Sequence, residues 1–399
     1  GLKATLLRMR DGAGVGSGAP DLPTPELIPN VEPGNVFEHF VMPRAAAPRA
    51  SIIIPIYNKW SYTEACLRSL AKETQRSGFE VIVVDDGSAD QSAEHLAQID
   101  GITVHRNIEN LGFVGSCNAG AALAQGEYLV FLNNDTQVAP NWLDALLDTF
   151  QQHARVGLVG SKLVYPDGRL QEAGGIIFSD GSGWNYGRFG DPRDPACNYV
   201  REVDYCSGAA IAIPRPLFEQ RGGFDARYAP AYYEDTDLAF QVREAGLRVL
   251  YQPASTVFHF EGVTAGTDTS AGAKKYQVIN QQKFLERWAA VLAQQPQPGA
   301  SISLAREHRV GRHVLIVDAT TPHPDEDSGS VRMVNLMQLL VALGDKVYFF
   351  AENRAFDGRY TEALQQIGVE ALYHPWMPEP MRWLRENGAQ FDAVILSRH

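Results

Sequence analysis

Four short stretches of the sequence hold the residue types that bind charged ligands or move protons. Three of them are apolar runs that end abruptly in polar or acidic residues, at 57–58, 85–86 and 133–135. The fourth is an acidic cluster at 234–237. An apolar run of this kind is typical of a buried parallel strand, and ligands bind just beyond the carboxyl ends of such strands. The pattern therefore predicts a site for a metal-bound, phosphate-bearing ligand.

The acidic residues of the third and fourth stretches have the clearest chemistry. A carboxylate at Asp135 follows an apolar run directly, and it is costly there unless it meets a cation, a donor or solvent. Its hard oxygen suits Mg²⁺ or Mn²⁺. At Glu234 and Asp235, one carboxylate can act as a general base on a hydroxyl. The alternatives are a turn or a helix cap at Asp135, and a capping role for the acidic pair.

Three further features support other hypotheses. Asp85 or Asp86 can accept a hydrogen bond from a nucleotide base, or can form a turn with a helix cap. Glycines within 110–120 would let the backbone approach a diphosphate at a helix start, although they lack the spaced dinucleotide fingerprint. His259 lies in an apolar run, where a histidine is usually a satisfied core residue, and a metal-ligand role is the alternative.

Strands that alternate with helices would bring these residues together. The predicted strands cover 52–56, 80–84, 103–106 and 128–132, with helical patterns at 62–74, 91–98 and 114–124. This alternation predicts right-handed βαβ units and a parallel sheet. The later segments are a hairpin at 156–178, a long loop at 181–198, a strand at 208–213 and helices at 235–244 and 276–292. We expect the long loop to close over a ligand, and the aromatic stretch 228–233 to form the wall of a sugar site.

The length of 399 residues favours two domains. We expect an extended arm or linker at 1–48, an α/β domain at 49–293, a linker at 294–311 and a Rossmann-like α/β lobe at 312–399. The sequence stops directly after a predicted strand at 393–396, so we expect further domains of a longer polypeptide.

Composition limits the partners. The formal net charge of −12 argues against nucleic acid, because neutralising phosphates needs a basic face. No run approaches the roughly 20 apolar residues that span a bilayer. The four cysteines lack close-paired metal spacing and indicate reduced thiols. We expect a cytoplasmic protein that reaches the inner face of the cell membrane through its partners or its acceptor.

Residues from about 50 to 290 resemble the family 2 glycosyltransferases, which have the GT-A fold. The resemblance rests on seven stretches in the family's order, namely 51–58, 83–88, 110–120, 131–135, 222–225, Glu234-Asp235 and His259. The sequence motif Asn-Leu-Gly-Phe-x-Gly, followed by Asn-Asn-Asp-Thr, is similar to motifs of the bacterial branch that includes rhamnosyltransferases of surface-polysaccharide assembly. The implied fold is a mostly parallel sheet with flanking helices, the GT-A nucleotide-diphospho-sugar transferase fold.

The resemblance also implies a role for individual residues. Those that would contact the nucleotide or diphosphate are Pro55, Tyr57, Asn58, Asp86, Gly112, Asn118, Asn133, Asn134 and Asp135. Asp135 and His259 would be ligands of Mn²⁺ or Mg²⁺, and Asp235, with Glu234 beside it, would be catalytic. Asn133 stands where the family has its first carboxylate, so the donor diphosphate and His259 would complete the metal site.

The last part of the chain has a resemblance of its own. Residues 312–399 are similar to the N-terminal Rossmann-like lobe of family 4 glycosyltransferases, which have the GT-B fold, through 313–318, 327–332 and 344–347. In that fold the other lobe mainly holds the donor, and this sequence lacks it. We therefore predict that this portion alone is inactive.

The resemblance implies an inverting, hexose-transferring enzyme of bacterial surface polysaccharide synthesis. It would move a sugar from a nucleotide-diphosphate sugar, thymidine-linked rhamnose or a uridine-linked sugar, to a hydroxyl of a glycan or lipid-linked glycan. One alternative is a non-catalytic glycan-binding or scaffold module that keeps the GT-A shell. A nicotinamide-dependent oxidoreductase is the other, and the missing glycine fingerprint argues against it.

Overall fold

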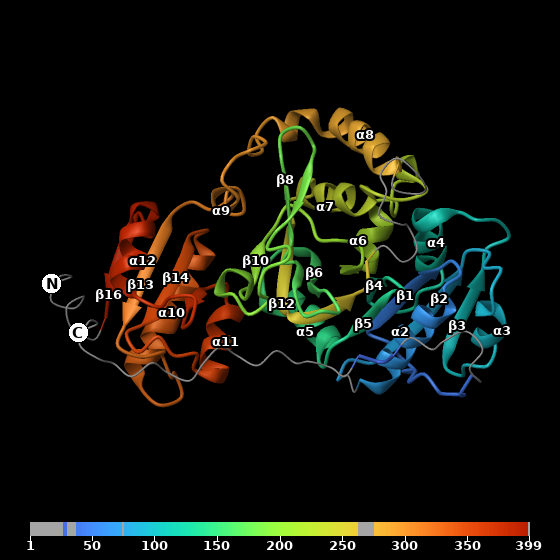
Figure 1. Ribbon diagram of the computed structural model, residues 1–399, viewed down its shortest axis with the longest axis horizontal. Helices are drawn as coiled ribbons and strands as arrows, with labels where there is room; N and C mark the ends of the chain where they lie inside the picture. Colours follow the sequence, from blue (N-terminus) through green and yellow to red (C-terminus); the bar gives the residue numbers. More distant parts are fainter. Residues whose placement is uncertain (1–26, 30–36, 74–75, 262–274, 398–399) are drawn as a thin grey trace. The chain divides into compact units, whose positions relative to one another are not determined.

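The computed structural model describes residues 27–29, 37–73, 76–261 and 275–397 (Figure 1). These described residues form two compact units. The first lies within Pro23–Gly190 and Glu202–Arg306, and the second within Asp191–Arg201 and Glu307–His399. Within the described part of the chain, no helix is both long and apolar enough to cross a membrane.

The first unit is built on one mixed sheet with the strand order β10-β12-β6-β11-β4-β1-β2-β3 (Figure 1). Its parallel half consists of β1 (Ala50–Ile56), β2 (Phe79–Asp85), β3 (Ile102–Arg106) and β4 (Tyr128–Leu132). The helices that follow these strands are α2 (Trp60–Lys72), α3 (Ser92–Leu96), α4 (Gly112–Ala121) and α5 (Trp142–Gln152). The predicted α/β class with a mostly parallel sheet and flanking helices is confirmed for this region.

Both faces of the parallel half are covered. Ile52 and Ile54 of β1 pack in one core cluster with Leu67 of α2 and Leu143 of α5. The intervening Ile53 points to the opposite face, because successive side chains of a strand alternate. There α4 comes so close that a Cβ on its Gly120 would lie 2.6 Å from Ile53. Burial on both faces explains why these strands are continuous apolar runs.

The other half of the sheet contains antiparallel pairs. Its strands are β5 (Thr136–Val138), β6 (Val156–Val164), β7 (Leu170–Glu172), β10 (Arg201–Glu202), β11 (Ala210–Pro214) and β12 (Arg248–His259). The helical segments here are α6 (Arg215–Gln220), η2 (Ala226–Tyr228), α7 (Glu234–Glu244), α8 (Lys275–Leu292) and α9 (Ile302–Ala305). The predicted hairpin at 156–178 is present as β6 and β7, which pair antiparallel.

The prediction of one long loop at 181–198 is wrong. Its first part forms β9 (Gly183–Asn185), which pairs with β8 (Gly175–Ile177) in a separate hairpin. Its last part contains the 3₁₀ helix η1 (Pro195–Cys197) and belongs to the second unit. In that unit Tyr199 is 1% exposed and the N–H of Val200 donates to the carbonyl of Gln365 at 2.9 Å. Contacts with residues far along the sequence therefore order this stretch.

The second unit has a four-stranded parallel sheet with the order β15-β14-β13-β16. The strands are β13 (His313–Asp318), β14 (Lys346–Ala351), β15 (Glu370–Leu372) and β16 (Ala393–Leu396). Besides η1, the helical segments of this unit are α10 (Ser328–Ala342), α11 (Gly358–Gln366), α12 (Pro380–Asn387) and the 3₁₀ segment η4 (Gly388–Gln390). Apolar clusters cover both faces of the sheet, as a parallel sheet requires. The assignment of this unit to a GT-B lobe stays a prediction.

Candidate active site

A cavity of about 940 Å³ opens in the first unit beyond the carboxyl ends of β1, β2 and β4. Of the residues proposed from the sequence, those that line it are Pro55, Tyr57, Asp86, Gly112, Asn133, Asn134, Asp135, Glu234, Asp235 and His259. The stretches near 135 and 235 therefore converge on one cavity, as a single site requires. Glu172, Tyr205, Ser207 and Gly208 also line it, and no sequence motif pointed to them.

Asp135 and His259 meet because β5, directly after Asp135, pairs with the end of β12. Nε2 of His259 lies 3.3 Å from Oδ1 of Asp135, and its Nδ1 lies 3.1 Å from Oε1 of Gln171. Burial opposes the charged form of Asp135, but the charge and hydrogen bond of His259 outweigh it and hold the pKa of Asp135 below its usual range. Burial also opposes a charged His259, and the negative Asp135 nevertheless raises the pKa of His259.

Asp135 and His259 together offer two of the ligand atoms that a divalent ion needs. Two ligands at right angles, each about 2.1 Å from one ion, lie about 3 Å apart, close to the separation seen here. The contact with Gln171 directs Nδ1–H away from the site and leaves Nε2 as the ligand atom. Among the described residues there is no group of three or more His, Cys, Asp or Glu side chains that could hold a metal. A bound substrate would have to supply further ligands.

Asp235 lies in the first turn of α7 and is partly buried. Its Oδ2 accepts a hydrogen bond from the N–H of Gly208 at 2.8 Å, and its Oδ1 accepts one from the N–H of Thr236 at 2.6 Å. Burial raises the pKa of Asp235, while these hydrogen bonds oppose the rise. The result is a fixed carboxylate with an increased proton affinity, which suits a general base.

Glu234 lies beside Asp235 in a different environment. It is 6% exposed, and among the described residues its Oε2 is buried without a hydrogen-bond partner. Burial, with the negative Asp235 next to it, raises the pKa of Glu234 well above its usual value. Glu234 therefore holds a proton more readily than an ordinary glutamate and, when protonated, can donate a hydrogen bond, whereas Asp235 accepts protons.

Asp86 contacts the loop before α4. Its Oδ1 accepts hydrogen bonds from Asn107 and from the N–H of Leu111, both at 2.8 Å, and its Oδ2 accepts one from the N–H of Gly112 at 2.9 Å. Gly112 has φ +70°, and a Cβ there would come within 2.5 Å of Pro230. The glycine is thus required by chain packing, and Asp86 orders the rim of the cavity.

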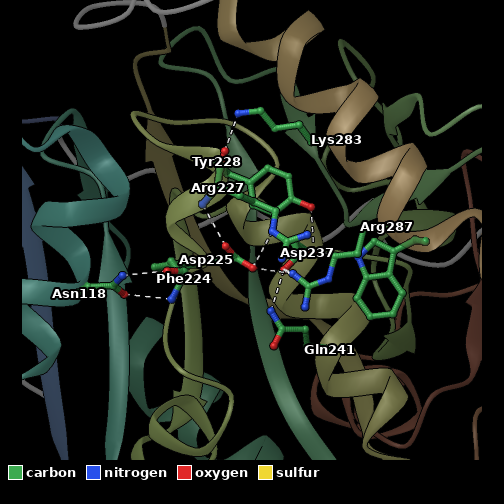
Figure 2. A network of polar contacts seen from close by, with 10 residues as sticks. Asn118, Phe224, Asp225, Arg227, Tyr228, Asp237, Gln241, Lys283 and Arg287 are labelled. Carbon is green, nitrogen blue, oxygen red and sulfur yellow. Dashed lines mark hydrogen bonds and ion pairs between the residues drawn. The ribbon is translucent and has the colours of Figure 1, made fainter.

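Two predicted ligand-binding residues, Asn58 and Asn118, do not line the cavity. Oδ1 of Asn58 accepts from the N–H of Ala89 at 2.8 Å, which joins the end of β1 to the turn after β2. The amide of Asn118 makes two hydrogen bonds with the backbone of Phe224, at 2.8 and 2.9 Å (Figure 2). Both side chains hold neighbouring segments together in this structure.

Aromatic residues line another part of the cavity. Tyr232 and Tyr233 of the predicted aromatic wall line the cavity, whereas Tyr228 is fully buried and does not line it. Trp184 of the β8–β9 hairpin also lines the cavity and is 49% exposed. Tyr276, in the first turn of α8, joins them. Aromatic rings with exposed faces are suited to contact sugar rings.

A known family matches part of this region. Residues 51–221 match the family model described as Glycosyl transferase family 2. The matched part includes the ends of β1, β2 and β4, and it stops before α7. It supports a family 2 glycosyltransferase domain in this part of the chain.

Curated relatives align with a similar stretch. An uncharacterized protein of Sinorhizobium fredii is 32% identical over 235 residues, which is 56% of this chain and 26% of the relative. The O-antigen biosynthesis protein RfbC of Myxococcus xanthus is 29% identical over 237 residues, 57% of this chain and 18% of the relative. The N-acetylglucosaminyl-diphospho-decaprenol L-rhamnosyltransferase of Mycobacterium tuberculosis is 28% identical over 245 residues, which is 55% of this chain and 78% of the relative. The chain thus spans about a quarter or less of the length of the first two.

Solved structures give more distant similarities. GalNAc-T7 with UDP, GalNAc and Mn²⁺ is 19% identical, covers 61% of this chain and 48% of its own, and has a TM-score of 0.48. The mannosyltransferase PcManGT from Pyrobaculum calidifontis, in complex with GDP-Man and Mn²⁺, is 19% identical, covers 65% and 68%, and has a TM-score of 0.43.

Proposed function

We propose that the first unit transfers a sugar from a nucleotide-diphosphate sugar to a hydroxyl of a glycan acceptor, with inversion at the anomeric carbon. The observation that carries this proposal is the single cavity that Asp135, His259, Glu234 and Asp235 share. The family match of 51–221 supports it.

The donor side lies at the ends of β1, β2 and β4. We assign the nucleotide base to Pro55, Tyr57 and Asp86, which face the cavity there. Asp135 and His259 are the residues that would hold Mn²⁺ or Mg²⁺, and the bound ion would neutralise charge on the leaving diphosphate. Asn133 adds a neutral amide whose Nδ2 lies 3.5 Å from Nε2 of His259.

The acceptor side lies at the start of α7. Asp235 takes the proton of the acceptor hydroxyl while that oxygen forms a bond to the anomeric carbon. The bond from this carbon to the diphosphate oxygen breaks on the opposite side, so the configuration inverts. The N–H groups of Gly208 and Thr236 hold the carboxylate in place; they oppose the effect of burial on its pKa, but burial outweighs them and the pKa of Asp235 stays raised.

The names of the relatives support a choice of substrates. We propose thymidine-linked rhamnose as donor, with uridine-linked sugars as the alternative, and a lipid-linked glycan as acceptor. The relative from Mycobacterium tuberculosis is named for rhamnose transfer to a decaprenol-linked N-acetylglucosamine, and that from Myxococcus xanthus for O-antigen biosynthesis. Surface-polysaccharide synthesis is the process that we propose for this chain.

A direct assay tests the proposal. The full chain would be incubated with Mn²⁺, radiolabelled dTDP-rhamnose or a UDP-sugar, and a short-chain polyprenyl-diphospho-N-acetylglucosamine. We expect labelled lipid product and an equal amount of free nucleotide diphosphate, and the anomeric coupling constant of the product reports inversion. If no donor in the panel gives acceptor-dependent nucleotide release, the domain is a non-catalytic glycan-binding module instead.

We also propose that the second unit is the first lobe of another sugar-transfer module and is inactive alone. Its four-stranded parallel sheet supports a Rossmann-like lobe. Turnover of a nucleotide sugar by an Asp235→Asn full chain at a rate close to that of the wild type would contradict this, because the first unit should then retain only about 10⁻² to 10⁻⁴ of its rate.

A further inference from the structure

The chain adopts an unusual backbone conformation directly before the acidic pair. Tyr232 has φ +77° and Tyr233 has φ +72°. Large side chains are rarely found in this left-handed region, because Cβ approaches the following carbonyl oxygen. Tyr233 is also the residue from which α7 starts, and it makes no side-chain capping bond there. Something outside this turn must hold the two residues in place.

Asn280 of α8 makes the contacts that can do so. Its side chain is completely buried, and its Nδ2 donates toward the carbonyls of Tyr228, Ala231 and Tyr232 at 2.8, 2.9 and 3.0 Å. Three carbonyls that converge on one amide define the path of the chain from Tyr228 to Tyr232. Oδ1 of Asn280 is buried and has no hydrogen-bond partner among the described residues. The side chain is therefore placed for its donors alone.

The helix that carries Asn280 is itself anchored by a polar network around the buried Asp237 (Figure 2). Arg287 of α8 bridges Asp225 at 2.8 Å and Asp237 at 2.9 Å, and Trp288 donates to Asp237 at 2.8 Å. One turn earlier, Lys283 reaches the carbonyl of Arg227. Because Asp237 belongs to α7, this network fixes α8 against the same helix that carries the acidic pair. Asn280 is thus presented to the turn from a helix that is bonded to α7.

We propose that Asn280 is a positioning residue for Asp235. Its amide holds the 228–232 turn, keeps Tyr232 and Tyr233 left-handed and thereby sets where α7 begins. In that position Oδ2 of Asp235 meets the N–H of Gly208. Without the amide, both tyrosines relax toward ordinary φ values and the first turn of α7 shifts. This inference rests on the proposed function for the role of Asp235, but the geometric part stands on the contacts alone.

The sharpest test is Asn280→Asp, which keeps the shape and replaces the donor by an acceptor that repels three carbonyls. We expect kcat to fall at least tenfold, while the Kd of dTDP with Mn²⁺, measured by calorimetry, changes less than twofold. The acid limb of the pH–rate profile should move to higher pH, because Asp235 loses a hydrogen bond to its charged form. Retained nucleotide binding shows that the variant is folded.

The matched control is Gln282→Glu, the same amide-to-carboxylate change at an exposed position of α8. Its side chain contacts Glu286 and does not approach the turn. We expect kcat and the pH profile of this variant to match the wild type. Equal losses in both variants would show a general effect of charge on α8 and would overturn the proposal.

A double-mutant cycle tests the left-handed turn itself. Glycine adopts positive φ without strain, so Tyr232→Gly should reduce the need for the amide. We compare the factor by which Asn280→Ala reduces kcat in the two backgrounds. We expect this factor to be at least five times smaller in the Tyr232→Gly background than in the wild-type background. Equal factors in the two backgrounds would mean that Asn280 does not act through this turn.

Hydrogen exchange gives a readout that does not depend on turnover. The N–H of Gly208 should exchange at least tenfold faster in Asn280→Asp than in the wild type, and in Gln282→Glu it should not. Unchanged exchange at Gly208 would overturn the inference. If the wild type transfers no sugar from any donor, the proposed function fails, and the exchange measurement still decides the role of Asn280.

Discussion

Nε2 of His259 lies 3.3 Å from Oδ1 of Asp135, although 124 positions separate the two residues in the sequence. The pairing of β12 with β5 brings them together, and Gln171 orients the imidazole. The imidazole and carboxylate thus lie side by side where the cavity begins. They contact each other in the protein alone, and we propose that a divalent ion would bind the same two atoms.

Replacing His259 should therefore weaken metal-dependent donor binding. For His259→Ala we expect the Kd of dTDP in Mn²⁺ to rise at least about 10- to 100-fold, because the loss of even an outer-shell partner of a metal ligand lowers metal affinity by this factor. The Kd measured in EDTA should be the same for the variant and the wild type. Calorimetry on the full chain measures both values. An equal loss with and without Mn²⁺ would show that His259 supports the fold and does not bind metal.

We predict different roles for the two acidic residues, with Asp235 as the base and Glu234 as a protonated hydrogen-bonding group. Asp235→Asn removes the proton acceptor, so we expect kcat to fall by about 10²- to 10⁴-fold with donor Kd unchanged. Glu234→Gln keeps the hydrogen-bonding pattern of the neutral acid that burial favours at this position, so kcat should fall less than tenfold. Single-turnover transfer assays measure both variants. A larger loss in Glu234→Gln than in Asp235→Asn would exchange the two roles.

Activity should decline on the acid side at a higher pH than an ordinary aspartate predicts. A base acts only when ionised, and burial raises the pKa of Asp235. The rate is therefore full above the raised pKa and is lost as the pH falls through it, at a value above about 3.9. The pH dependence of kcat/KM measures this limb.

A matched variant checks the assignment of that limb. The hydroxyl of Thr236 lies 3.2 Å from Oδ1 of Asp235. Thr236→Val removes this donor to the charged form, so the acid limb should move to still higher pH. A limb that stays in place in this variant would point to another group.

The buried network between α7 and α8 should contribute more to stability than a surface ion pair. Arg287→Met leaves the fully buried Asp237 without its cationic partner, and we expect a loss of about 3 kcal/mol in the free energy of unfolding of the first unit. Arg169→Met breaks an exposed pair with Asp167, which solvent screens, and should leave the free energy of unfolding almost unchanged. Urea unfolding followed by tryptophan fluorescence compares the two variants, and equal losses would contradict the argument.

The sequence predicts those parts of the site that depend on local pattern. Strand ends carrying Asp86 and Asp135 were recognisable because buried parallel strands are apolar until they meet solvent. The amphipathic pattern after Glu234 and Asp235 placed the acidic pair at a helix start. The structure brings these positions to one cavity, and the chemical roles proposed for them stay predictions.

What depends on distant contacts was not predictable. Asn118 matched a motif, but its amide is taken up by the backbone of Phe224, which lies 106 positions further along. The sequence predicted a loop at Trp184, because no local sequence pattern indicates that this residue pairs with Ile176 in the β8–β9 hairpin. For Asn280, the sequence shows only a polar residue in an amphipathic helix, and its three carbonyl partners emerge from the path of the 228–232 turn.

Trp184 should contribute to acceptor binding and not to donor binding. Trp184 belongs to the β8–β9 hairpin, and the N–H of Gly175 in β8 donates to the carbonyl of Tyr205 at 2.8 Å. Tyr205 is followed closely by Gly208, the partner of Asp235, and Trp184 lines the same cavity, so we propose that its ring contacts the acceptor. An aromatic face that contacts a sugar ring is worth on the order of 1 kcal/mol.

We therefore expect Trp184→Ala to raise the KM for a polyprenyl-diphospho-N-acetylglucosamine acceptor about five- to tenfold, with the KM for the donor unchanged. Phe189→Ala is the matched control, because Phe189 is also exposed and lies near in sequence but does not line the cavity. Initial-rate kinetics with each substrate varied in turn separate the two constants. A rise in donor KM alone would move the aromatic contact to the nucleotide sugar, and no change in either would remove Trp184 from the site.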